Sequence, residues 1–180
     1  MSQNIKIPND LEAWEILENK DVFTAEPWIK LSVQKIRLPD GRIIDNYHKV
    51  EFPEYAVVFA MTCSGEVITE WLYKHGVGKA CLSLPSGLLD PGEKPLDAAK
   101  RELLEETGYT ANQWSHLGSF VMNGNYGCGK AHLFIAKDAS RVTNPDAGDL
   151  EEIRVQTVSR ASLLESLQNG EISLIGTAAA

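Results

Sequence analysis

The sequence predicts a mixed α/β (α+β) fold in which a β-sheet is sandwiched between helices. Strand-like segments outnumber helical ones, and the two kinds do not alternate regularly along the chain. Regular alternation is typical of parallel sheets, so its absence favours a mixed sheet. The length of 180 residues suits one domain, or one domain with a small appendage.

Two segments near the N-terminus predict a β-hairpin. Residues 28–38 alternate apolar and polar side chains, as a half-buried strand does. Pro39-Asp40-Gly41 is a turn sequence, and residues 42–52 return as a second strand. Residues 1–24 predict only a short helical or irregular lead-in.

The middle of the chain predicts short strands followed by one pronounced helix. The strands are expected at residues 55–61, 66–73 and 80–84, the first of them a continuous apolar run. Residues 95–107 form the strongest helical pattern. Pro95 suits its first turn and Gly108 suits the position after its last turn.

The C-terminal part predicts further strands and a second helix. The strands are expected at residues 116–122, 131–136 and 152–158, and the helix at 160–168. His132 falls within one of these strands, where a hydrogen-bonded core histidine is a commoner occurrence than a catalytic one.

Composition and charge argue against several classes of protein. Lys and Arg number 17 and Asp and Glu number 25, so the net charge of −8 disfavours a nucleic-acid-binding surface. No apolar run reaches the roughly 18 residues of a membrane span. The first twenty residues also lack the apolar core of a secretory signal. Three widely spaced cysteines form no zinc pattern, which favours reduced thiols in a cytoplasmic protein.

The helix expected at 95–107 carries a crowded acidic face. Glu102, Glu105 and Glu106 recur at spacings of three and four residues, where like charges cost about 0.2–0.5 kcal/mol per pair. The helix dipole disfavours anions near the C-terminal end by about 0.3–1 kcal/mol each. Arg101 can offset part of this cost. A hard cation, Mg²⁺ or Mn²⁺, would offset more, and a solvated acidic face is the alternative reading.

The residues around this helix match an extended spacing motif. The pattern resembles the Nudix box, G-x5-E-x7-R-E-U-x-E-E-x-G-U, in which U is a bulky aliphatic residue. Its fixed positions are Gly87, Glu93, Arg101, Glu102, Leu103, Glu105, Glu106 and Gly108. Only the last position departs from the pattern, because Tyr109 stands where an aliphatic residue is usual.

The resemblance implies a Nudix hydrolase with a metal site built by a loop and a helix. Carried over by position, Glu102 and Glu106 would bind metal directly, and Glu105 would be a ligand or bridge a second ion. The carbonyl of Ser86 would complete the metal shell. Arg101 would orient the glutamates through an ion pair.

From about residue 28 to 170, the chain is similar to the ADP-ribose pyrophosphatase branch of this family. That similarity implies Mg²⁺-dependent hydrolysis of ADP-ribose to AMP and ribose 5-phosphate. Another nucleotide sugar such as GDP-mannose, or a dinucleotide, is an alternative substrate. A non-catalytic Nudix-fold ligand-binding module is the third possibility.

The same similarity implies roles for residues outside the motif. Lys74 would contact the substrate, and Trp28 would stack on its base, although solvation or plain packing explains either residue equally well. Glu151 would act as general base, with Glu152 as the alternative. The branch usually forms homodimers through its N-terminal strands. We therefore expect a dimerisation and base-binding region over residues 1–52 and the Nudix domain over 53–180.

Two departures from the branch affect the expected substrate. Ser83 stands where the branch commonly has a glutamate that supports the metals. The tail SLIGTAAA is shorter than in many relatives, which leaves open whether a final helix is present.

Overall fold

The computed structural model describes residues 8, 11–146, 148, 150 and 152–180. The chain forms two compact units. The N-terminal unit comprises Met1–Phe52 with Asn123–Cys128, and the main unit comprises Pro53–Met122 with Gly129–Ala180. Among the described residues, no helix has both the length and the apolar character needed to cross a lipid bilayer.

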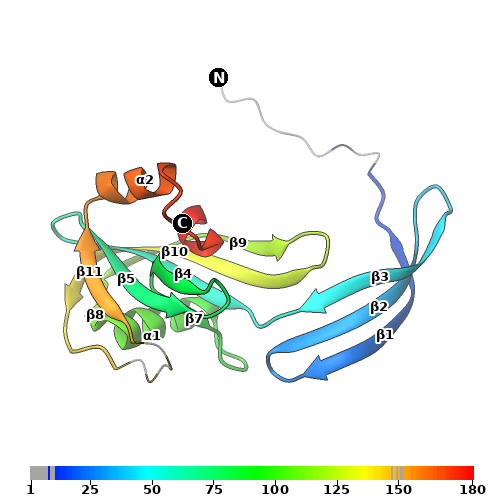
Figure 1. Ribbon diagram of the computed structural model, residues 1–180, viewed down its shortest axis with the longest axis horizontal. Helices are drawn as coiled ribbons and strands as arrows, with labels where there is room; N and C mark the ends of the chain where they lie inside the picture. The colour runs from blue at the N-terminus through cyan, green and yellow to red at the C-terminus, as the bar shows by residue number, and fades with distance from the viewer. Residues whose placement is uncertain (1–7, 9–10, 147, 149, 151) are drawn as a thin grey trace. The chain divides into compact units, whose positions relative to one another are not determined.

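The N-terminal unit contains a three-stranded antiparallel sheet in the order β1-β2-β3 (Figure 1). The strands are β1 (Glu15–Ala25), β2 (Ile29–Arg37) and β3 (Ile43–Glu51). The expectation of a helical or irregular lead-in was wrong from Glu15 onward. Two register shifts in β1 break the simple alternation of apolar and polar residues that would have identified this strand.

The main unit is built on a mixed sheet, as the sequence predicted. Its central path runs β11-β5-β4-β10-β8, with β6, β7 and β9 paired to β5, β4 and β10. The pair β4–β10 is parallel, whereas β4–β5 and β5–β11 are antiparallel. The strands are β4 (Tyr55–Thr62), β5 (Val67–Lys74), β6 (Lys79–Ser83), β7 (Ser86–Leu88), β8 (Tyr109–Thr110), β9 (Gln113–Asn123), β10 (Cys128–Arg141) and β11 (Arg154–Val158).

Helices pack on both faces of this sheet (Figure 1). Helix α1 (Pro95–Thr107) lies on one face, and α2 (Arg160–Gln168) and α3 (Ile175–Ala179) lie on the other. Strand β4 serves both cores because its side chains alternate. Ala56, Val58 and Ala60 pack with α1, whereas Val57 packs in the cluster that contains Leu163 of α2.

The ends of α1 follow from the residues that the sequence analysis identified. Pro95 occupies the first turn, where its missing N–H removes no helical hydrogen bond. Gly108 ends the helix with φ 75°, and its N–H donates to the carbonyl of Leu104. A left-handed conformation at this position favours glycine. The helix therefore starts and stops so that its last two turns present Glu102 and Glu106.

Candidate active site

Two buried carboxylates of α1 face the short strand β7. The exposed fraction is 8% for Glu102 and 4% for Glu106, although α1 packs mainly through apolar side chains. Glu106 Oε2 accepts a hydrogen bond of 2.7 Å from the backbone N–H of Ser86. A Cβ atom built on Gly87 would lie 2.1 Å from the carboxyl carbon of Glu102. Glycine at position 87 therefore gives the Glu102 carboxylate its room beside the backbone.

Arg101 joins the carboxylates of the helix to the preceding loop. Its guanidinium forms two bonds to Glu93, from Nε to Oε1 at 3.0 Å and from Nη2 to Oε2 at 2.9 Å. Nη1 donates to Glu102 Oε1 at 2.7 Å and Glu105 Oε2 at 3.1 Å, and Nη2 also donates to the carbonyl of Leu88. These bonds raise the pKa of Arg101 and lower the pKa of Glu93. Arg101 thus remains charged and directs its donors to the protein.

Glu105 is placed differently from its two neighbours. Its side chain is 41% exposed, and its Oε2 bonds to Arg101 Nη1. The residue does not line the pocket that Glu102 and Glu106 share. The side chains of the acidic trio therefore divide into an inward pair and one outward member that contacts Arg101.

The inward pair lines a pocket of about 410 Å³, here called the acidic pocket. Asp90, Lys74 and Tyr55 also line it. Lys74 comes from the end of β5 and forms no ion pair with any residue that the structure describes. Tyr55 begins β4, and burial raises the pKa of its hydroxyl. The pocket thus combines carboxylates with the ammonium group of Lys74, the guanidinium of Arg101 and a phenol.

The donor set of the acidic pocket fits a hard divalent cation. Among residues 8, 11–146, 148, 150 and 152–180, no group of three or more His, Cys, Asp or Glu side chains is placed to hold a metal. Mg²⁺ does not need such a group, because it is usually bound by one or two carboxylates, waters and substrate phosphates. Glu102 and Glu106 meet that requirement, and the space around them leaves room for oxygen ligands from a substrate.

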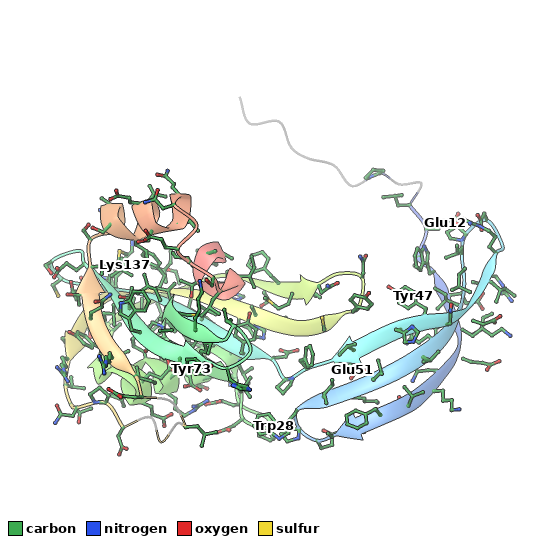
Figure 2. The ribbon with its side chains drawn as sticks, in the orientation of Figure 1. Glu12, Trp28, Tyr47, Glu51, Tyr73 and Lys137 are labelled. Carbon is green, nitrogen blue, oxygen red and sulfur yellow. The ribbon has the colours of Figure 1, made fainter. Side chains whose placement is uncertain are left out.

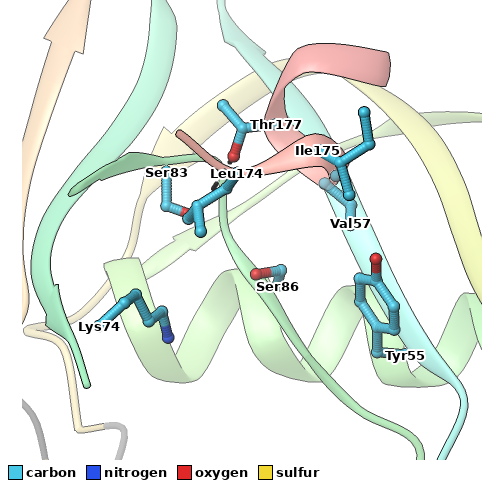
Figure 3. A pocket seen from close by; sticks show the side chains of 9 residues that line it. Tyr55, Val57, Lys74, Ser83, Ser86, Leu174, Ile175 and Thr177 are labelled. Atoms are coloured by element: carbon cyan, nitrogen blue, oxygen red, sulfur yellow. Dashed lines mark hydrogen bonds between the residues drawn. The ribbon is translucent and has the colours of Figure 1, made fainter. Parts of the chain in front are cut away.

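A second pocket of about 200 Å³, here called the distal pocket, shares Tyr55, Lys74 and Ser86 with the acidic pocket. Figure 3 shows Lys74, Ser86 and Tyr55 along one side of this pocket, opposite the residues at the start of α3. One wall contains Val57 and Ser83. The other is formed by Leu174–Thr177, at the start of α3.

A final helix, α3, is present although the tail is short. Thr177 is buried, and its Oγ1 accepts a 3.2 Å bond from the N–H of Leu84. The hydroxyl of Ser83 donates to the carbonyl of Leu84 and lies 3.4 Å from Thr177 Oγ1. The small side chain at position 83 thus contacts the C-terminal helix.

Three other residues predicted for the site either do not line these pockets or are not among the described residues. Trp28 belongs to the N-terminal unit, in the turn between β1 and β2, and is 63% exposed (Figure 2). Glu151 lies outside the described residues. Glu152 is exposed and pairs with Arg154 at 3.0 Å. Their roles remain predictions.

Sequence reasoning missed Tyr55 and Asp90 as pocket residues. Tyr55 opens a strongly apolar run and was interpreted only as part of a buried strand. Asp90 stands before Pro91-Gly92, in a turn sequence that by itself indicates no functional role. A polar group at the start of a buried strand was the one available signal for Tyr55.

His132 is a hydrogen-bonded interior residue. Its Nε2 lies 2.7 Å from Glu54 Oε2, and its Nδ1 lies 2.7 Å from Ser119 Oγ. Lys130 also bonds to Glu54, and these two bonds lower the pKa of the Glu54 carboxyl. The contacts agree with the expectation of a core histidine rather than a catalytic one.

The chain is similar to known proteins over most of its length. The methanol dehydrogenase activator of Bacillus methanolicus is 30% identical over 158 residues, which cover 86% of this chain and 84% of the relative. The ADP-ribose pyrophosphatase of Bacillus subtilis is 29% identical over 145 residues, which cover 80% of this chain and 78% of the relative.

The fold has a counterpart among solved structures. The crystal structure of an ADP compounds hydrolase superposes with a TM-score of 0.80 at 21% identity, covering 96% of this chain and 92% of the other. The sequence itself matches the NUDIX domain over residues 53–175, which contain α1, β7 and the acidic pocket, whereas the lining of the distal pocket extends to Thr177. The chain therefore belongs to the Nudix hydrolase family.

Proposed function

We propose that this Nudix hydrolase is an ADP-ribose pyrophosphatase that forms AMP and ribose 5-phosphate. The observation that carries the proposal is the inward pair, Glu102 and Glu106, in one pocket with Lys74. A cation held by the carboxylates and a positive side chain would together neutralise the charge of a diphosphate. The similarity to the pyrophosphatase of Bacillus subtilis favours ADP-ribose over GDP-mannose or a dinucleotide.

Mg²⁺ is the proposed cation, held by Glu102 and Glu106 with the carbonyl of Ser86 as a further ligand. When bound, a divalent cation supplies charge neutralisation at the diphosphate and activation of water. Glu105 supports the site through Arg101, which its carboxylate already contacts. Glu105 is also the proposed ligand or bridge to a second ion, through the carboxylate oxygen that does not contact Arg101.

We propose that Lys74 is the side chain of this protein that contacts the phosphates of the substrate. Arg101 cannot replace it, because its guanidinium already bonds to three carboxylates and one carbonyl. An ammonium group on a flexible stem binds phosphate oxygens as a point charge. Glu151 is the proposed general base, with Glu152 as the alternative, because the branch that this chain resembles often has a catalytic glutamate at this place in the sequence.

The N-terminal unit supports the proposal of a homodimer. Phe23 of β1 pairs with Leu31 of β2, which pairs with Val50 of β3, so these residues form an apolar row across the sheet. Phe23 is 54% exposed, and exposed apolar groups of this kind mark interaction surfaces. Trp28 is the proposed base-stacking residue of this unit. The free cysteines Cys63, Cys81 and Cys128 support the proposed cytoplasmic location.

The test is hydrolysis of a panel of nucleoside diphosphate compounds with Mg²⁺, followed by identification of the products. We expect AMP and ribose 5-phosphate from ADP-ribose, and a loss of turnover of at least about 100-fold in Glu106→Gln and Glu102→Gln. Glu165→Gln is the matched control, because Glu165 is an exposed residue of α2. Unchanged turnover in both site variants would refute the metal assignment. Tight binding of ADP-ribose without turnover would favour the non-catalytic module.

A further inference from the structure

The distal pocket is chemically different from the acidic pocket that it adjoins. Val57, Leu174 and Ile175 give it a largely aliphatic lining. The hydroxyls of Ser83 and Thr177 are already bonded around Leu84. The Tyr55 hydroxyl donates to Met122 Sδ at 2.9 Å and keeps only its acceptor capacity. Polar interactions with an occupant are therefore concentrated at the seam between the two pockets, chiefly at Lys74 and Ser86 (Figure 3).

Charge restricts what the distal pocket can hold. Among the residues that the structure describes, Lys74 is the one charged residue in this lining, and it stands at the seam rather than in the wall formed by α3. A charged group moved past Lys74 would gain no ionic partner from this described lining, whereas an uncharged group needs none. The lining thus favours an uncharged occupant attached to a phosphate that stays beside Lys74.

Size restricts the occupant further. The volume of about 200 Å³ is smaller than the roughly 300–1,000 Å³ of pockets for drug-sized ligands. A single sugar ring presents an apolar face with a few hydroxyls and matches both the volume and the lining. A complete nucleoside, with its base and its ribose, is larger and more polar.

We propose that α3 and the residues before it form a specificity element, which holds the uncharged sugar ring at the far end of the substrate. This inference rests on the proposed function, because it assigns a substrate class to the same site. The distal pocket would select nucleoside diphosphates that carry one sugar ring. It would disfavour dinucleotides, which are too large, and nucleoside triphosphates, which place further charge beyond Lys74.

Gly176 gives the sharpest test of this assignment. A Cβ atom at this position would lie 3.2 Å from Val57 Cγ2 and 3.5 Å from the Tyr55 hydroxyl, so Gly176→Leu adds volume inside the distal pocket. Ala179→Leu is the matched control, since it adds the larger side chain at an exposed position of the same helix. Thermal unfolding of both variants shows whether the fold is retained.

The readout compares ADP-ribose with the methyl ester of ADP, which keeps the adenosine and the diphosphate but replaces the sugar by a methyl group. In Gly176→Leu, the ratio of kcat/KM for ADP-ribose to that for the methyl ester should fall at least tenfold. In Ala179→Leu the ratio should stay within twofold of the wild type. An equal loss for both compounds in Gly176→Leu, or a matching fall in Ala179→Leu, would overturn the inference.

Ile175→Ala keeps the test decisive if Gly176→Leu does not fold. This change enlarges the distal pocket, so turnover of ADP-glucose relative to ADP-ribose should rise severalfold, and an unchanged ratio would count against the inference. Wild-type turnover of ADP-ribose upholds the proposed function in every one of these outcomes. If the wild type hydrolyses neither compound, the proposed function fails. In that case the Kd values of ADP-ribose and the methyl ester are measured by calorimetry with Mg²⁺ in the same variants. The ratio of these two Kd values then decides the inference alone.

Discussion

At the scale of single residues, Gly87 determines where the Glu102 carboxylate can lie. A Cβ atom at position 87 would overlap the carboxylate of Glu102. Moving the flexible end of the Glu102 side chain, rather than the backbone, would relieve this overlap. The cost of adding a methyl group therefore appears in the geometry of the site more than in folding.

We predict that Gly87→Ala lowers kcat for ADP-ribose at least tenfold while changing the free energy of unfolding by less than about 1 kcal/mol. Steady-state kinetics at saturating Mg²⁺ and urea unfolding measure the two effects. Gly124→Ala is the control, because a Cβ atom there meets nothing within 4 Å. A large loss of stability with normal turnover would show that Gly87 serves the backbone instead.

The ion pair between Glu93 and Arg101 predicts a pH dependence of stability. The pKa of Glu93 is lowered in the folded state, chiefly by its hydrogen bonds from Arg101. Its contribution is therefore fully present above the unfolded pKa of about 4.3 and is lost as pH falls through the lower folded value.

We expect Glu93→Gln to cost about 1–3 kcal/mol at pH 7, and its stability to fall less steeply on acidification than that of the wild type. Urea unfolding between pH 7 and pH 3 measures both effects, with Glu165→Gln as the control. Parallel curves for Glu93→Gln and the wild type would contradict this role of Glu93.

Sequence spacing predicted the identity of these residues but not the direction of every side chain. Glu102 and Glu106 face inward, as the metal role proposed for them requires, whereas Glu105 turns to Arg101. A helical wheel places all three glutamate side chains on one side of the helix. It contains no information about which of them contact Arg101. Tyr55 and Asp90 were missed because a pocket gathers residues from separate elements, and a local pattern cannot group them.

At the scale of elements, the end of α1 depends on Gly108 for two separate reasons. Its φ of 75° disfavours residues with a side chain, and a Cβ atom would lie 2.2 Å from the carbonyl oxygen of Thr143. Gly92 shares the first constraint, with φ 81°, but a Cβ atom there meets nothing within 4 Å. Substitutions at Gly92 and Gly108 can therefore separate the cost of backbone strain from the cost of steric overlap.

We predict that Gly92→Ala costs about 1–2 kcal/mol through its backbone conformation. Gly108→Ala should cost a further ~1–3 kcal/mol, because the backbone at Thr143 must move. Chemical unfolding of the two variants gives the difference. Equal costs would mean that the loop at Thr143 adapts freely.

Helices whose sequence marks both ends clearly were predicted well. The bounds of α1 and α2 were predicted because the helical period was clear and a glycine follows each helix. β1 was missed because its bulges interrupt the alternation, and α3 because five residues contain too little periodicity. The two-residue strand β8 and the three-residue strand β7 have the same limitation of length.

At the scale of the whole molecule, the apolar row across the N-terminal sheet predicts how two copies associate. Phe23→Asp places a charge in this row, and we expect it to convert a dimer into a monomer at micromolar concentration. Sedimentation velocity measures the change, and circular dichroism checks the fold. Val142→Asp is the control, since it makes the same kind of change at an exposed apolar residue of the main unit. A wild-type monomer, or a dimeric Phe23→Asp variant, would contradict the assignment.

The mixed sheet was predictable because strands outnumber helices and fail to alternate with them. The arrangement of the strands was not, since the parallel pair β4–β10 joins segments more than seventy residues apart. Contacts of that separation depend on the packing of both helical layers, which no local pattern encodes.

Strand β4 also links the two helical layers energetically. Since neighbouring residues of one strand pack in opposite cores, loosening either layer removes support from the backbone on which the other one rests. The layer that carries the carboxylates and the layer that ends in α3 should therefore melt together, in a single cooperative transition.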